Sequence, residues 1–381
     1  MKKAINLILL VLLALTAGAG LDIKAESAIL IDAGSGSVLY EKNADVIRAP
    51  ASTTKMMTAI LLIENANLQD EVTVGPNVLK ATGSSLHLKP GEKIKIFDLL
   101  CAILMRSAND ACVAAAEHVS GSVEKFSTLM NLKAIDLKMM HTHFNNPHGL
   151  NDPLHSTTAR DLALLASYCM KNQTFRDVIT FEKCLISRSL NREDLLVRNH
   201  NKLLGKYPGL EGIKTGYTVP AGHCFVGCAS RNGFRIISVV MKSPNWQAET
   251  KMLLDYGFKS FRAWPYTKPG TKVGDVSVDN GESSSVSVVV GAAGMAVIPV
   301  SVNTANLKGQ PKYDKLTAPI LEGQQVGVIE VKEAGRPVGI IPLVAEKAVP
   351  IGNGSSSRRA AWTAIFAALI AAAVIRRRRN G

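Results

Sequence analysis

Apolar positions along the first two thirds of the chain follow two different periods. Helical spacing, with apolar residues three and four apart, is found in residues 56–63, 97–119 (interrupted near 106–110) and 248–258. Short apolar runs of strand length occupy residues 28–31, 38–40, 213–215, 225–229 and 235–241. Asn232-Gly233, between the last two runs, is a strong hairpin signal. The pattern predicts an α+β domain over residues 26–265, with helices packed on an antiparallel sheet.

The pattern changes after Pro269-Gly270. Valine-rich stretches of strand length alternate with Gly, Pro and Asn turns, and they fall at residues 276–278, 286–290, 295–300, 326–331 and 338–344. No segment with helical spacing separates them. We therefore expect a second, all-β domain over residues 270–350, and because it carries no catalytic constellation we interpret it as a spacer or interaction module.

Both ends of the chain have apolar segments that belong to neither domain. Residues 1–20 combine Lys2 and Lys3, an apolar run and small residues at 17–19, which predicts a secretory signal peptide. Residues 351–359 are a Gly- and Ser-rich linker, and the uncharged apolar run 360–375 that follows is closed by four arginines. We expect an exported protein held at the outer face of the cell membrane by a C-terminal transmembrane helix. A helix lying on the membrane surface is the alternative.

Charge and cysteine content argue against a nucleic-acid-binding protein, a disulfide-rich fold and a metal site. The formal charge is +13, of which two lysines at the N-terminus and six arginines at the C-terminus contribute eight, leaving +5 for the body. No basic block with interleaved aromatics suggests nucleic-acid binding, and a mildly basic surface suits an acidic cell-surface polymer. The six cysteines lie mostly in apolar runs, so we interpret them as buried small hydrophobes and not as a disulfide framework. No spacing of His or Cys indicates a metal, and we expect no cofactor.

The candidate chemistry begins at Ser52-Thr53-Thr54-Lys55. A serine at the start of a helix lies beside unpaired backbone N–H groups, and a lysine three residues later lies on the same helix face. A buried, neutral lysine amine could take the proton of the serine hydroxyl. Taken alone, Ser52 is better explained as a helix cap.

Two further motifs support the catalytic interpretation. Ser107-Ala108-Asn109 interrupts the helical segment 97–119, and Lys214-Thr215-Gly216 begins a strand. Each is ordinary turn or strand chemistry by itself, but the three occur in the order found in penicillin-recognising serine acyl-transferases.

With these residues laid out, the chain resembles the D-alanyl-D-alanine carboxypeptidase family of low-molecular-mass penicillin-binding proteins, a group of serine peptidases. The resemblance runs from about Glu26 to Trp264 and rests on residues 50–59, 107–109, 146–150, 156–162 and 212–216. It implies a helical subdomain packed on an antiparallel sheet, with the site between them. The substrate would be a peptidoglycan stem peptide, and β-lactams would be inhibitors.

The resemblance also implies a role for each site residue. Ser52 would be the nucleophile, Lys55 its base and Ser107 a proton relay. Asn109 would bind the substrate amide, Lys214 and Thr215 the terminal carboxylate, and Gly216 would belong to the same binding strand. The backbone N–H groups of Ser52 and Tyr217 would form the oxyanion hole. We also expect the charge of Lys214 to lower the pKa of Lys55.

Two positions depart from relatives and bear on fine specificity. Tyr217 stands where some relatives have His, and Asn245-Trp246-Gln247 lacks an Arg that many carry. Three alternatives use the same fold: a β-lactamase, a DD-endopeptidase and a non-catalytic wall-binding protein. No convincing carboxylate for activating the deacylating water is found, which argues against a β-lactamase, and the intact motifs argue against a protein that has lost catalysis.

Overall fold

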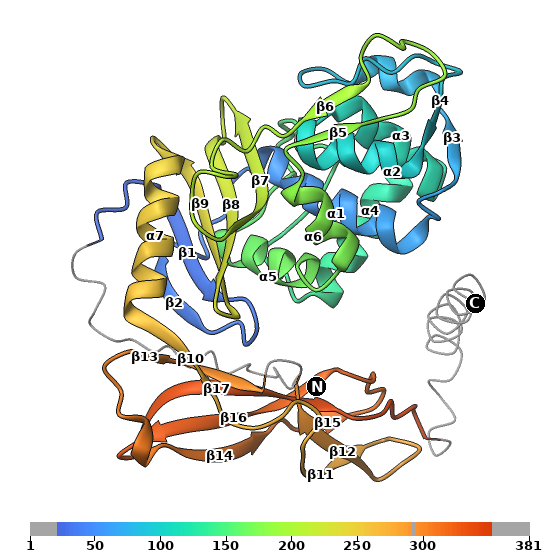
Figure 1. Cartoon of the computed structure of the whole chain (residues 1–381). Helices are drawn as coiled ribbons and strands as arrows, with labels where there is room; N and C mark the ends of the chain where they lie inside the picture. The colour runs from blue at the N-terminus through green and yellow to red at the C-terminus, as the bar shows by residue number, and fades with distance from the viewer. Residues whose placement is uncertain (1–20, 292–293, 353–381) are drawn as a thin grey trace. The chain divides into compact units, whose positions relative to one another are not determined.

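The computed structural model describes residues 21–291 and 294–352, which divide into two compact units (Figure 1). The first contains residues 21–263 and 297–302, and the second contains 264–291, 294–296 and 303–352. The predicted signal peptide, the anchor and nearly all of the linker lie outside the described residues. Within the described ranges, no helix combines the length and apolar character that crossing a membrane requires.

A five-stranded antiparallel sheet forms the centre of the first unit. Its strand order is β2-β1-β9-β8-β7, with bounds β1 Ser27–Asp32, β2 Val38–Lys42, β7 Leu210–Thr218, β8 Gly222–Arg231 and β9 Phe234–Ser243. Asn232 and Gly233 both have positive φ in the β8–β9 turn, as the hairpin signal predicted. The alternating side chains of β1 enter two different cores, with Ile29 in one and Leu30 in the other. Both faces of the sheet are therefore covered.

Helices cover the two faces unequally. Helix α7 (Trp246–Ser260) packs on one face, while the other helices gather beyond the opposite face (Figure 1). These are α1 Lys55–Asn65, α2 Ile96–Cys101, α3 Asn109–Ser120, α4 Val123–Asp136, α5 Ala159–Cys169 and α6 Gln173–Thr180, with the short 3-10 helices η2 Ala51–Thr54 and η3 Pro76–Lys80 and the π-helix η4 Ala102–Arg106. The predicted break near residues 106–110 lies between η4 and α3.

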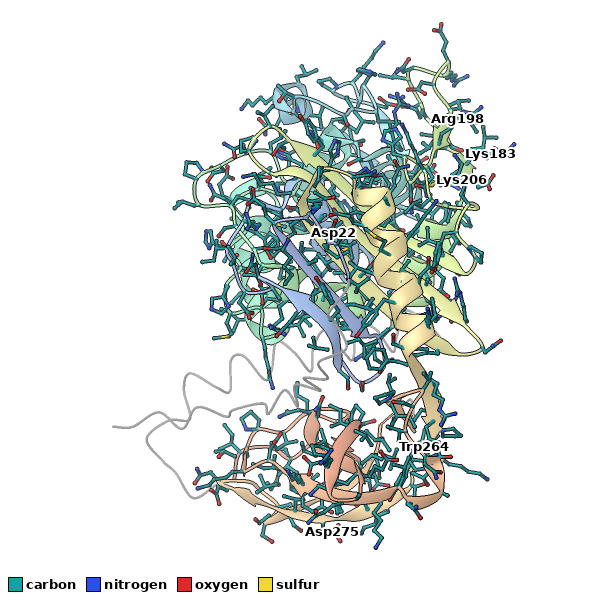
Figure 2. All side chains as sticks on the ribbon, turned by 90° about the vertical axis from the view of Figure 1, so that its left-hand side faces the viewer. Asp22, Lys183, Arg198, Lys206, Trp264 and Asp275 are labelled. Atoms are coloured by element: carbon teal, nitrogen blue, oxygen red, sulfur yellow. The ribbon has the colours of Figure 1, made fainter. Side chains whose placement is uncertain are left out.

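Two short antiparallel strand pairs complete the helical region. Strand β3 (Glu71–Thr73) pairs with β4 (Lys93–Lys95), and β5 (Lys183–Leu185) pairs with β6 (Leu196–Arg198). Lys183 and Arg198, which are opposite each other in the β5–β6 register, are labelled in Figure 2.

The second unit is all-β apart from one short turn, η5 (Thr304–Asn306). Its six-stranded sheet has the order β14-β16-β17-β12-β11-β15, with bounds β11 Lys272–Asp279, β12 Ser285–Val290, β14 Lys308–Tyr313, β15 Leu316–Thr317, β16 Gln325–Glu333 and β17 Arg336–Ala345. Strand β10 (Phe261–Pro265) pairs with β13 (Met295–Pro299) in a separate two-stranded sheet, most of whose residues belong to the first unit. The α+β domain followed by an all-β domain confirms the predicted fold class.

Candidate active site

Ser52 and Lys55 meet as their spacing predicted. Ser52 lies in the single turn η2, and Lys55 is the first residue of α1. The Nζ atom of Lys55 donates a hydrogen bond to the Oγ atom of Ser52 over 2.8 Å, and the side chain of Lys55 is fully buried. The turn itself is strained, because Ala51 has a φ of +50°. The serine is thus presented directly to a buried amine.

A second contact to Lys55 comes from the loop 146–150, to which the sequence analysis assigned no catalytic or binding residue. The backbone carbonyl of His148 accepts a hydrogen bond from Lys55 Nζ over 2.6 Å. The Oδ1 atom of Asn146 accepts from the backbone N–H groups of His148 and Gly149 and so shapes this loop. Gly149, at φ +85°, packs so close to Ala51 that a Cβ atom would lie 1.9 Å from the Ala51 carbonyl oxygen. In the sequence, Asn146-Pro147-His148-Gly149 is the pattern that could have indicated this loop as part of the site.

Two buried lysines dominate the electrostatics of the site. Burial lowers the pKa of Lys55 to about 8. Burial, and after it the nearby charge of Lys55, lowers the pKa of Lys214 to about 7. Repulsion between two amines is mutual, and the amine that loses its proton at the lower pH, here Lys214, relieves it. Both amines can therefore change protonation state near neutral pH.

The Ser107-Ala108-Asn109 segment follows an unusual piece of backbone. Residues Ala102–Arg106 form a π-helix, and Ser107 then adopts a left-handed conformation with a φ of +63°. Such conformations are uncommon for residues with a Cβ atom and often occur at functional sites. Among the described residues, no hydrogen bond joins the Ser107 hydroxyl to Ser52 or Lys55.

Asn109 has one end fixed and one end free. Its backbone N–H donates to the Ser84 carbonyl over 2.7 Å, and its Nδ2 atom donates to the Thr82 carbonyl over 2.5 Å. Its Oδ1 atom is buried and has no hydrogen-bond partner among the described residues. A buried acceptor without a partner is costly, so this amide oxygen is suited to accept a hydrogen bond from a ligand N–H group.

Strand β7 brings the third motif to the nucleophile. Lys214 is buried, and its Nζ atom donates to the Thr215 carbonyl over 3.1 Å. A Cβ atom at Gly216 would lie 3.0 Å from the backbone nitrogen of Ser52, so only glycine permits this close approach without displacing the turn. Tyr217 is 57% exposed, and its ring lies against His223 with the centroids 4.6 Å apart.

The arrangement provides the parts of an acyl-transfer site. It has a hydroxyl bonded to a buried amine, a second buried cation that can hold a carboxylate, and an amide oxygen that is free to accept a hydrogen bond. No group of three His, Cys, Asp or Glu side chains in the described part of the chain could hold a metal ion. All six cysteines are free thiols and five are buried, which confirms their interpretation as small hydrophobes.

Comparisons with known proteins agree with the resemblance seen in the motifs. Residues 14–245 match the family model described as D-alanyl-D-alanine carboxypeptidase, and residues 261–350 match the penicillin-binding protein 5 C-terminal domain. The D-alanyl-D-alanine carboxypeptidase DacA of Escherichia coli (strain K12) is 36% identical over 87% of this chain and 85% of its own. DacF of Bacillus subtilis (strain 168) is 32% identical over 85% of each chain. The crystal structure of penicillin binding protein 5 from Haemophilus influenzae, 28% identical, superposes with a TM-score of 0.69 over 86% of this chain and 98% of that one.

Proposed function

The chain belongs to the D-alanyl-D-alanine carboxypeptidase family of serine peptidases, and on this premise we propose how its residues carry out the reaction. The protein is a serine-type hydrolase that removes the terminal D-alanine of peptidoglycan stem peptides. Neutral Lys55 takes the proton of Ser52, and the Ser52 oxygen attacks the carbonyl carbon between the two D-alanines. The backbone N–H groups of Ser52 and Tyr217 stabilise the resulting oxyanion.

Collapse of this intermediate releases D-alanine and leaves an ester on Ser52. The departing nitrogen receives a proton that Ser107 passes on from the Lys55 ammonium. Water then hydrolyses the ester, with Lys55 again acting as the base, and the free enzyme is restored. A single general base for both steps is supported by the 2.8 Å contact between Lys55 and Ser52. That contact, made by a fully buried amine, is the observation that carries the proposal.

Substrate binding uses the charge of Lys214, the hydroxyl of Thr215 and the side-chain amide of Asn109. The terminal carboxylate pairs with the protonated amine of Lys214 and with the hydroxyl of Thr215, and it also shields Lys214 from the repulsion of Lys55. The buried Oδ1 atom of Asn109 accepts a backbone N–H of the stem peptide. Gly216 keeps β7 close to the nucleophile, so that the peptide can lie along this strand.

The reaction is tested by the release of free D-alanine from diacetyl-L-lysyl-D-alanyl-D-alanine. The wild-type chain releases one equivalent per peptide, and Ser52→Ala releases none although it keeps the same thermal unfolding temperature. Release by Ser52→Ala at a comparable rate would show that the nucleophile is another group.

Localisation is the second part of the proposal. The protein acts at the extracytoplasmic face of the membrane and is attached to it by residues 360–375, with the four arginines after this run on the cytoplasmic side. The lack of charge in the run supports a spanning helix, because a helix lying on the surface needs a polar face.

Fractionation of cells tests the anchor. The full chain should stay with membranes after high-salt and alkaline washing, whereas a chain ending at Ser357 should be released and still cleave the peptide. Release of the full chain by alkaline washing would contradict a spanning helix and leave only a surface association.

A further inference from the structure

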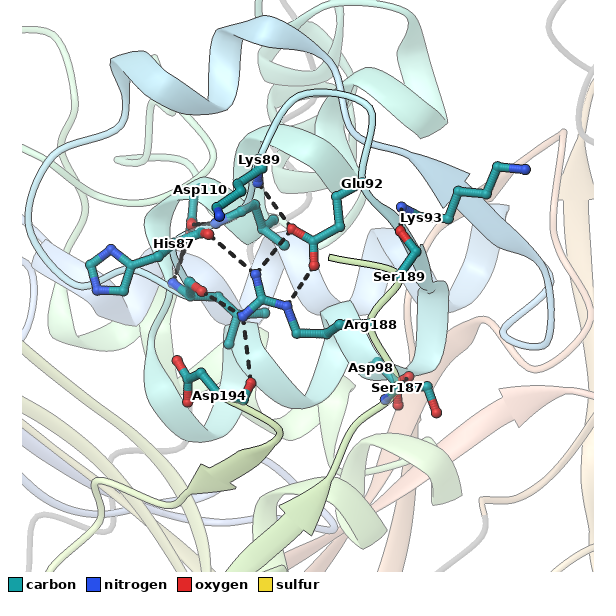
Figure 3. Close-up of polar contacts among 12 residues, drawn as sticks. His87, Lys89, Glu92, Lys93, Asp98, Asp110, Ser187, Arg188, Ser189 and Asp194 are labelled. Atoms are coloured by element: carbon teal, nitrogen blue, oxygen red, sulfur yellow. Dashed lines mark hydrogen bonds and ion pairs between the residues drawn. The ribbon is translucent and has the colours of Figure 1, made fainter. Parts of the chain in front are cut away.

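The turn that joins β5 to β6 carries a buried arginine that ties three segments together. The Arg188 side chain forms an ion pair with Glu92, with Nε 2.5 Å and one terminal nitrogen 3.0 Å from the two carboxylate oxygens, and both side chains are fully buried (Figure 3). Arg188 also donates to the carbonyls of Leu86 and His87 at 2.9 and 3.2 Å. The turn is thereby fixed to the loop that precedes β4.

The same loop is held from its other side by Asp110. The Asp110 carboxylate accepts hydrogen bonds from the backbone N–H groups of Leu86 and Leu88 (Figure 3). Asp110 directly follows Asn109, whose backbone and side-chain amides bind the same loop at Ser84 and Thr82. The loop is thus clamped between the β5–β6 turn and the start of α3.

The turn reaches the catalytic segment through a second ion pair. Arg188 donates to the backbone carbonyl of Asp194 over 3.4 Å, and the Asp194 carboxylate accepts two hydrogen bonds from one terminal nitrogen of Arg106, at 2.8 and 2.6 Å. Arg106 ends the π-helix and directly precedes Ser107. One continuous chain of contacts therefore runs from buried Glu92 through Arg188, Asp194 and Arg106 to the strained residue.

The backbone at Ser107 needs such support. A left-handed φ costs a residue with a Cβ atom of the order of 1–3 kcal/mol and persists only where the surroundings enforce it. The backbone leaves the regular α-helical ladder here, because the N–H groups of Ser107 and Ala108 both reach back to the Ala102 carbonyl. Arg106 is the last side chain before the strained residue, so an anchor on its guanidinium opposes relaxation of the segment.

We propose that Asp194 is a positioning residue: through Arg106 it holds Ser107 in the conformation that lets the hydroxyl pass a proton to the departing nitrogen. The inference rests on the proposed role of Ser107 as a relay. Asp194 touches neither substrate nor the reacting atoms. Its removal should slow the acylation step and leave the initial binding of substrate unchanged.

The test measures acylation of the full-length chain by benzylpenicillin over a range of concentrations, which separates the initial dissociation constant from the acylation rate. Asp194→Asn keeps the shape but loses the charge, and we expect the rate to fall about tenfold while the dissociation constant changes less than about twofold. The thermal unfolding temperature should stay almost unchanged, because the pair is 24% and 31% exposed and such pairs contribute little stability.

Asp45→Asn is the matched control. It weakens another two-hydrogen-bond pair between an arginine and a carboxylate, to Arg160 at 2.7 and 2.9 Å, that is not linked to Ser107. We expect its acylation rate to equal that of the wild type. Arg106→Gln should resemble Asp194→Asn, and the double variant should be no slower than either single variant, because both changes break the same link.

The outcomes separate the inference from the function on which it rests. If Ser107→Ala acylates slowly and Asp194→Asn acylates at the wild-type rate, the positioning role is wrong and the relay stands. If Ser107→Ala acylates normally, the relay is wrong and the inference falls with it. An additive double variant, or an equal loss in Asp45→Asn, would also overturn the inference.

Discussion

The two units differ most in whether their buried charged side chains have ion-pair partners. The first buries Lys55 and Lys214 almost completely, and neither has a carboxylate partner among the described ion pairs. In the described part of the second unit, Glu330 is the one charged residue that is buried, and it pairs with Lys312 and Lys332. Burying an unpaired charge is costly, and burying a paired one costs less because the partners offset part of the lost hydration. The unpaired buried charges thus lie in the unit that contains the candidate active site.

Backbone strain follows the same division. In the first unit, eight residues with a Cβ atom have positive φ, and two of them, Ala51 and Ser107, belong to or adjoin catalytic motifs. In the second unit, the residues with a Cβ atom and positive φ, Asn280 and Ala334, each precede a glycine in a turn between strands. Positive φ at residues with a Cβ atom is therefore more frequent in the first unit, and part of it lies in the catalytic motifs.

The largest expected effect comes from making the charge at position 55 permanent. Lys55→Arg keeps a long cationic side chain, but a guanidinium does not lose its proton at any accessible pH. We expect acylation by benzylpenicillin to slow about 10²- to 10⁴-fold, the usual contribution of a general base. The rate is followed by intact-mass spectrometry, with circular dichroism as the check on folding. Near-normal acylation would place the base elsewhere.

The second effect is a pH dependence set by the lysine pair. Activity rises as Lys55 loses its proton, with a pKa of about 8, and falls as Lys214 loses the proton that binds the carboxylate, with a pKa of about 7. Because the two amines interact, kcat/KM should be bell-shaped between them and report the pair. Bound carboxylate raises the pKa of Lys214, so kcat should lack the alkaline fall.

Lys214→Arg is the variant that sharpens this pH prediction. Its guanidinium stays charged, so the alkaline fall in kcat/KM should disappear while the acidic rise remains. A variant that keeps the alkaline fall would show that Lys214 is not the group that titrates there.

The third effect is a loss of unfolding free energy when the buried ion pair of the first unit is broken. Glu92→Gln leaves Arg188 buried without a counter-charge, which should destabilise the first unit by about 3–5 kcal/mol. Urea unfolding followed by the fluorescence of Trp246, with Trp264 and Trp362 replaced by Phe in both chains compared, measures the difference. A loss below about 1 kcal/mol would show that the buried pair is readily replaced.

Glu330→Gln in the second unit is the counterpart with the smallest effect. Lysines 312 and 332 are 47% and 28% exposed, so we expect a loss below about 1 kcal/mol and unchanged D-alanine release. The hydrogen bond from Lys312 lowers the pKa of Glu330, so this stabilisation is present above the unfolded value of about 4.5 and is lost as the pH falls through the folded value. A large loss at neutral pH would contradict the contrast between the units.

Sequence reasoning succeeded where the residue type itself carries the signal. The Ser52–Lys55 contact follows from helical spacing, and the β8–β9 turn follows from Asn232-Gly233. Sequence reasoning missed contacts that are made by backbone atoms or by side chains far apart in the sequence. The His148 carbonyl reaches Lys55 across 93 positions, and any residue type has a carbonyl. Asp194 and Arg106 are 88 positions apart, and the π-helix between Ala102 and Arg106 has no distinctive sequence pattern.

The central claim, that Ser52 is acylated, is tested most directly by mass spectrometry after treatment with benzylpenicillin. The account predicts a long-lived adduct of the whole drug, on the proteolytic peptide that contains Ser52, and no adduct in Ser52→Ala. Labelling that persists in Ser52→Ala would contradict the assignment of the nucleophile, and an adduct on Ser52 that hydrolyses within seconds would indicate a β-lactamase.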